Sequence, residues 1–198
     1  MATFAQPVTL AGRHATLVPL SLQHVDALAE AARDGELWRL WYTTVPSPEQ
    51  MGAEVRRRLD LQDKGAWLPF TVLDPQGTPV GMTNYLNIDP APPRVEIGGT
   101  WYAARMQRTP LNTECKQLLL RHAFETLGCA AVEFRTHVIN QQSRRAIERL
   151  GARFDGILRA HMRMPNGTLR DTAVYSVIES EWSTIKAHLQ WQLEKPRD

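Results

Sequence analysis

The chain has 198 residues, of which 43% are hydrophobic, and its 23 basic and 21 acidic side chains leave a net charge of +2. So balanced a charge lacks the basic excess typical of nucleic-acid or membrane-surface binding, and we expect neither partner. No apolar run reaches the ~20 residues that span a bilayer, and Cys115 and Cys129 fit no disulfide framework. These features predict a cytoplasmic globular protein, with residues 1–198 forming one domain.

The first part of the chain predicts two helices between short strands. Residues 8–20 alternate loosely between apolar and polar side chains, which indicates a strand pair or one bent strand. Ser21 is a good cap for an amphipathic helix that ends at Asp34–Gly35. Ser47 and Pro48 open a second helix, because a proline at the first helical position loses no hydrogen bond.

The rest of the chain predicts a meander of strands and then alternating helices and strands. Gly98–Gly99, inside the third strand of the meander, indicates a bulge or a close backbone approach. Asn166–Gly167 is a strong hairpin signal. The predicted strands cover residues 67–74, 79–88, 94–102, 130–138, 154–164 and 169–178, and the predicted helices about 112–127, 140–150 and 179–193.

This order of elements predicts a mixed α/β fold with α+β character. The meander and the hairpin favour antiparallel pairing, while the strands joined through a helix around residues 95–150 favour one parallel pair. We therefore expect a mostly antiparallel sheet that contains a single parallel strand pair.

Two polar segments follow the meander. Residues 107–114 read Gln-Arg-Thr-Pro-Leu-Asn-Thr-Glu and lead into a predicted helix. A helix start exposes backbone N–H groups and the positive end of the helix dipole, which suits a phosphate-bearing ligand. Residues 140–152 begin with Asn-Gln-Gln-Ser and end with Leu-Gly-Ala. Taken alone, the first segment is more simply a polar loop, and Asn140 could act as a helix cap and nothing more.

Together the two segments resemble the acyl-CoA site of the GCN5-related N-acetyltransferases (GNAT). From about Leu10 to Trp182 the chain is similar to the branch that acetylates ribosomal-protein N-termini (RimJ/RimL-like). The resemblance implies a twisted sheet whose parallel strand pair splays apart, with helices on both faces. It departs from the family at the loop, where Pro110 and Asn112 replace small residues and the proline removes one N–H donor.

The resemblance implies acetyl-CoA, and hence coenzyme A, as the co-substrate. The amides of the loop would hold the diphosphate, with Arg108 adding charge. The free edge of the third meander strand would bind the pantetheine arm as an added strand does. The implied coenzyme A-binding residues are Trp101, Tyr102, Ala103, Gln107, Arg108, Thr109, Leu111, Asn112, Thr113, Asn140 and Ser143.

Acyl transfer to an amine needs a proton acceptor for the ammonium, a donor for the oxyanion and a donor for the leaving thiolate. The resemblance implies Glu96 as the proton acceptor, although a structural salt bridge is an equally good interpretation. Ser143 is the preferred donor for the thiolate, before Tyr175 and His137. A backbone N–H near Tyr102 would serve the oxyanion.

The implied acceptor-binding residues are Trp38, Trp41, Tyr42, Asn84 and Glu96, and a core or lid role for the aromatic ones is equally open. We expect no metal site, because the histidines lack ligand spacing. The predicted function is transfer of an acetyl group from acetyl-CoA directly to a primary amine of a protein N-terminus or a small molecule. A non-catalytic acyl-CoA binding or sensing module is the alternative, and edge strands near the hairpin allow a homodimer.

Overall fold

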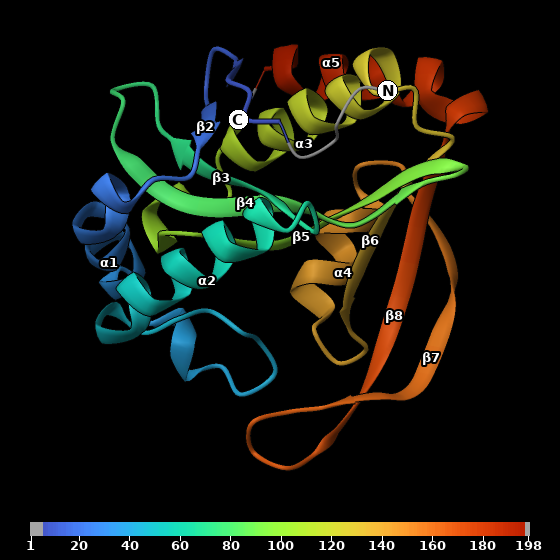
Figure 1. Ribbon diagram of the computed structural model, residues 1–198. Helices are drawn as coiled ribbons and strands as arrows, with labels where there is room; N and C mark the ends of the chain where they lie inside the picture. Colours follow the sequence, from blue (N-terminus) through green and yellow to red (C-terminus); the bar gives the residue numbers. More distant parts are fainter. Residues whose placement is uncertain (1–5, 197–198) are drawn as a thin grey trace.

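A computed structural model describes residues 6–196 and shows the predicted mixed α/β architecture (Figure 1). Within this range one sheet of eight strands has the order β1-β2-β3-β4-β5-β6-β8-β7. Neighbouring strands pair antiparallel, except for β5 and β6, which are parallel. The strands are β1 (Leu10–Ala11), β2 (Thr16–Pro19), β3 (Leu68–Leu73), β4 (Pro79–Pro90), β5 (Pro93–Tyr102), β6 (Ala131–His137), β7 (Arg153–Arg163) and β8 (Leu169–Ile178).

Helices cover both faces of the sheet, as expected. In the view of Figure 1, α3 and α5 lie above the sheet, whereas α1, α2 and α4 lie below it. In residues 6–196 no helix combines the length and the apolar character needed to cross a membrane. The α-helices are α1 (Val25–Arg33), α2 (Met51–Asp63), α3 (Leu111–Arg121), α4 (Gln141–Glu148) and α5 (Trp182–Glu194).

Two buried clusters hold these layers together. One lies between the sheet and α3 with α5, and includes Tyr85 and Leu119. The other lies between the sheet and α1 with α2, and includes Leu28 and Met82. Met82 and Tyr85 face opposite clusters because successive residues of a strand point to opposite faces. Burying each such side chain stabilises the fold by about 1.5–3 kcal/mol.

Several predicted local signals act as expected. Asn140 Oδ1 accepts a hydrogen bond from the Ser143 amide at 3.0 Å and caps α4. Asn166–Gly167 forms the turn between β7 and β8, with Gly167 at a φ of 85°. One boundary differs, because α3 begins at Leu111 and not at its polar neighbours. Pro110 precedes it with a φ of −59°, which already fits a helix.

The parallel pair splays apart, and β5 carries a bulge. Pairing covers Arg94–Glu96 of β5 and Ala131–Glu133 of β6, and beyond it the two strands diverge. Opposite β4, Met82 pairs with Trp101 and Asn84 with Gly98, so β5 contains one extra residue. Gly99 occupies this bulge with a φ of 58°, a conformation that favours glycine. The bulge predicted at Gly98–Gly99 is confirmed.

Candidate active site

A cavity of about 990 Å³ opens where β5 and β6 separate. It is bounded by these strands, the start of α3, one side of α4 and the segment 37–45 that follows α1. Predicted site residues from distant parts of the chain meet in its lining. They are Tyr42, Trp101, Tyr102, Gln107, Arg108, Thr109, Asn112, Asn140 and Ser143.

The remaining predicted site residues lie outside this lining. Ala103, Leu111 and Thr113 have buried side chains, so only their backbone groups could reach a ligand. The Ala103 amide already donates to the Val80 carbonyl at 2.8 Å, which leaves the Ala103 carbonyl. Trp38 packs against the cluster of α1 and α2, which is the core role that the sequence left open. Trp41, Asn84 and Glu96 contact residues that do line the cavity, namely His137, Gly98 and Arg135.

The loop before α3 presents donors to the cavity. The amides of the first helical turn have no partner within the helix, and Pro110, just before that turn, carries no N–H. Thr109 Oγ1 accepts a bond from the Leu111 amide at 3.3 Å, which leaves Asn112 and Thr113 as the freer donors. Arg108 has a φ of 61°, an unusual conformation for a residue with a side chain.

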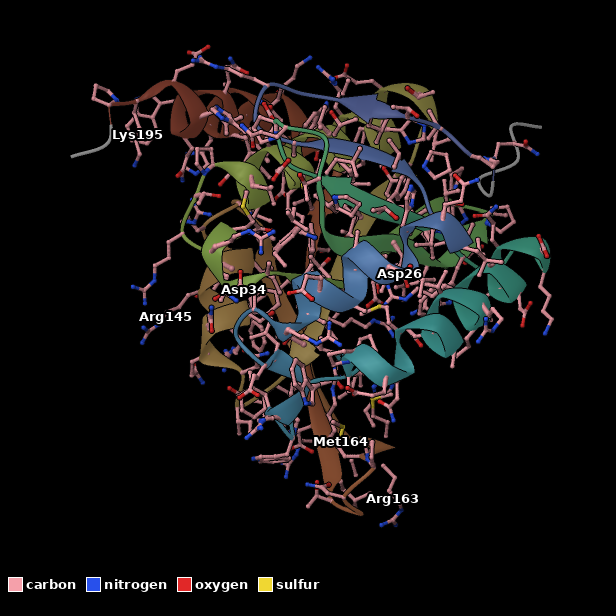
Figure 2. The ribbon with its side chains drawn as sticks, turned by 90° about the vertical axis from the view of Figure 1, so that its left-hand side faces the viewer. Asp26, Asp34, Arg145, Arg163, Met164 and Lys195 are labelled. Carbon is pink, nitrogen blue, oxygen red and sulfur yellow. The ribbon has the colours of Figure 1, made fainter. Side chains whose placement is uncertain are left out.

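Cationic side chains surround this loop. Arg149 donates to Thr113 Oγ1 at 3.0 Å and to Gln192 at 3.2 Å, and so ties α4 to α3 and α5. Lys195, just after α5, also lines the cavity, and Figure 2 shows it on the same side of the molecule as Arg145 of α4. This part of the cavity therefore attracts anions.

The start of α4 faces the loop across the cavity. Asn140 and Ser143 line it, and the Asn140 cap leaves its amide nitrogen and the Ser143 hydroxyl available to a ligand. Gln142 Nε2 donates to Gln107 Oε1 at 3.2 Å. This bond joins two segments that were predicted separately as parts of one site.

A buried network from α2 holds the bulge of β5. Arg58 is anchored to Glu54 at 2.7 Å and donates to Asn84 Oδ1 at 3.1 Å and to the Gly99 carbonyl at 3.4 Å. Asn84 Nδ2 in turn donates to the Gly98 carbonyl at 2.8 Å. In a trans peptide the N–H lies opposite the C=O, so the Gly99 amide points away from Asn84 and toward the splayed side of β5.

Glu96 lies behind Gly98, at the cavity wall. Its carboxylate accepts a bond from Asn87 Nδ2 at 2.6 Å and lies 3.4 Å from Arg135 Nε, so the alternative salt bridge is present. Burial raises the pKa of Glu96, and the Arg135 charge opposes that rise. A Cβ at residue 98 would lie 2.9 Å from Glu96 Oε1, so a glycine there keeps the carboxylate close to the cavity.

Tyr175 and His137, the two weaker candidates for the donor to the leaving thiolate, differ in their access to the cavity. Tyr175 bonds to Arg144 and Glu148, each at 2.8 Å, and is not part of the cavity lining. His137 lines the cavity, and its buried Nε2 has no hydrogen-bond partner within residues 6–196. Burial lowers the pKa of His137, and Trp41 packs edge-on against its ring at 5.6 Å. His137 is therefore neutral and available near pH 7.

Sequence reasoning missed Lys116. This side chain is buried, lines the cavity and donates to Thr100 Oγ1 at 2.7 Å. Burial lowers its pKa to about 8. Its place on the apolar face of α3, one helical turn before Leu120, was a usable signal, because buried lysines are rare. No group of three His, Cys, Asp or Glu side chains in the described chain could hold a metal ion.

Comparison with known proteins identifies the family. The family model described as the acetyltransferase (GNAT) domain matches residues 14–153, more than half of the chain. The chain belongs to the GNAT acetyltransferases. It is an enzyme of this family, so the alternative of a non-catalytic binding module is set aside.

Relatives of this GNAT acetyltransferase agree with that assignment. A GCN5-related N-acetyltransferase from Brucella melitensis is 34% identical, with a TM-score of 0.83 over 95% of this chain and 86% of that one. The protein named "Putative ribosomal N-acetyltransferase YdaF", from Bacillus subtilis (strain 168), is 31% identical over 110 residues, which are 56% of this chain and 59% of YdaF. Mycobacterium smegmatis RimJ, solved with CoA-disulfide, shares the fold at 18% identity, with a TM-score of 0.78 over 96% and 95% of the two chains.

Proposed function

We propose that this GNAT enzyme transfers an acetyl group from acetyl-CoA directly to a primary amine of a protein N-terminus or a small molecule. The splay of β5 and β6 carries this proposal. Because β5 and β6 separate, one cavity is lined by a helix start suited to phosphate, by an unpaired strand edge and by the segment 37–45. A donor and an acceptor bound in the same cavity can react within a ternary complex.

The cavity fits coenzyme A on the side of α3. Acetyl-CoA, when bound, supplies the activated acetyl thioester. The diphosphate matches the amides of Asn112 and Thr113 together with Arg108, since helix starts and guanidinium groups both favour phosphate. The free edge of β5 at Trp101–Tyr102, the carbonyl of Ala103 and the side-chain amide of Asn140 match the polar groups of the pantetheine arm.

Three groups of the chain match the needs of the reaction. Glu96 accepts the proton of the ammonium, through water passing Gly98, and its raised pKa suits a base that works near neutrality. Backbone amides on the free edge of β5, those of Gly99 and of a residue near Tyr102, donate to the oxyanion. The Ser143 hydroxyl donates to the leaving thiolate.

Two measurements test this function. Calorimetry should detect CoA binding to the full chain, and a thiol-release assay should detect transfer to at least one amine in a panel of small amines and ribosomal-protein N-terminal peptides. Ser143→Ala should lower kcat roughly tenfold with little change in CoA affinity, because one hydrogen bond made in the transition state is lost. A protein that binds no CoA species, or binds CoA and acetylates no amine, would refute the proposal.

A further inference from the structure

The cavity is lined by cations on its acceptor side as well as on its coenzyme A side. Arg108, Arg149 and Lys195 surround the start of α3, whereas Arg135 and Arg170 line the opposite part beside Gly98. Within residues 6–196 the lining contains no aspartate or glutamate. Phosphates account for the first set of cations, and the second set has no such ligand in the proposed reaction.

Arg170 is the unneutralised member of that second set. Its Nε donates to Thr172 Oγ1 at 2.9 Å, and no carboxylate of the described chain lies within ion-pair distance of it. The next residue, Asp171, is bonded elsewhere, to Arg159 at 2.6 Å and to the Ala160 amide at 2.8 Å. Arg170 is half-buried, so its charge is partly removed from water without a partner in return.

The nearby carboxylates are already occupied. Glu133 pairs with Arg135 at 2.8 Å and also with Arg94, and Glu96 lies 3.4 Å from Arg135. Three guanidinium groups thus face two carboxylates. His137, which also lines this part of the cavity, adds no charge near pH 7, because burial and Arg170 both lower its pKa. One positive charge is left over, on Arg170.

We propose that the acceptor amine carries a carboxylate close to its amino group and that Arg170 is the specificity residue that binds this carboxylate. This inference rests on the proposed function. A guanidinium presents paired N–H groups that match the two oxygens of a carboxylate, and Arg170 keeps its terminal nitrogens for that purpose. Glu96, the proposed proton acceptor, is a charged neighbour of Arg170, so the amine and the carboxylate of the acceptor must lie close together in space.

Such an acceptor can be a free amino acid or an acidic peptide, and two matched pairs of substrates distinguish these sources. The first pair is a free α-amino acid and its α-amide, which differ in the main-chain carboxylate. The second is a peptide with glutamate at its second and third positions and the same peptide with glutamine there. Acetyl transfer is measured as kcat/KM at saturating acetyl-CoA for each member.

We expect the anionic member of at least one pair to exceed its neutral partner by tenfold or more. Arg170→Gln should bring that ratio close to one, and Arg170→Lys should retain part of it, because the charge remains while the paired geometry is lost. CoA affinity, measured by calorimetry, should stay unchanged in both variants and so report that the coenzyme A side is intact. Arg163→Gln is the matched control, an exposed arginine on the same hairpin, outside the lining and bonded only to the Gly167 carbonyl, whose loss should leave the ratio unchanged.

Equal kcat/KM within both pairs in the wild type would overturn this inference and leave the proposed acetyl transfer standing. A ratio that survives in Arg170→Gln would overturn the role of Arg170. If the wild type binds no CoA, the proposed function is refuted, and this inference is refuted with it.

Discussion

At the scale of single residues, the site contains polar groups whose burial shifts their proton affinity toward neutrality. Burial raises the pKa of Glu96 and lowers that of Lys116 to about 8. A base works best when its pKa lies near the working pH, because it must be deprotonated and still bind a proton well. Glu96 therefore combines the right location, behind Gly98, with the right direction of pKa shift.

We predict that Glu96→Gln lowers kcat by about 100-fold or more, since general-base groups contribute about 10²–10⁴-fold. The base must be ionised, so wild-type kcat/KM should fall as the pH drops through the raised pKa of Glu96. That acidic limb should disappear in the variant. Steady-state rates measured from pH 5 to 9 check both effects, with the exposed Glu30→Gln as control. If kcat and the acidic side of the pH profile were both unchanged in the variant, a group other than Glu96 would accept the proton of the amine.

At the scale of elements, the reactive edge of β5 depends on a helix that does not touch the cavity. Arg58 of α2 reaches the carbonyl of Gly99 directly and that of Gly98 through Asn84. These bonds fix the direction of the Gly99 amide. Asn84, predicted to contact the acceptor, is fully buried and holds this backbone, so its contribution to acceptor binding is through the bulge.

We predict that Arg58→Met lowers kcat roughly 10- to 100-fold while KM for acetyl-CoA changes little. Deleting one oxyanion donor outright costs about 10²–10³-fold, and a displaced donor should cost less. Arg57→Met is a close control, because Arg57 pairs with the same Glu54, at 2.7 Å, from the exposed side of α2. Arg58→Lys should restore part of kcat. Equal loss in the Arg57 and Arg58 variants would indicate that only the stability of α2 matters.

At the scale of the whole molecule, one buried lysine makes stability depend on pH. Lys116 has a pKa of about 8 in the fold, against an unperturbed value of about 10.4 in the unfolded chain. Between these values the unfolded chain binds more protons, so stability rises with pH. Below pH 8 the buried charge destabilises the fold fully, and above 8 this cost is progressively relieved.

We predict that the unfolding free energy of the wild type rises between pH 7 and pH 9.5 by about 2 kcal/mol more than that of Lys116→Met. A single pKa shift of this size has that effect, and the variant lacks the titrating group. Urea unfolding of both proteins at several pH values measures the difference. Replacing the exposed Lys64 by Met should give no such trend. A difference that stays constant over this range would show that Lys116 keeps an ordinary pKa in the fold.

The β7–β8 hairpin is the other whole-molecule feature. It extends away from the body of the protein, with Arg163 and Met164 near its tip (Figures 1 and 2). Exposed apolar side chains along it include Ile157, Leu158 and Met162. A homodimer through this edge stays a prediction, as does a single domain for residues 1–198.

Local chemistry by itself determined much of this protein. The Asn166–Gly167 turn, the Asn140 cap and the Gly98–Gly99 bulge follow from local backbone preferences, and the order of strands and helices predicted one parallel pair in a mostly antiparallel sheet. The tertiary structure decided which charges share the cavity. Arg58, Lys116 and Arg170 lie far from one another in the chain, and their roles depend on burial and on missing partners, which arise when the layers pack.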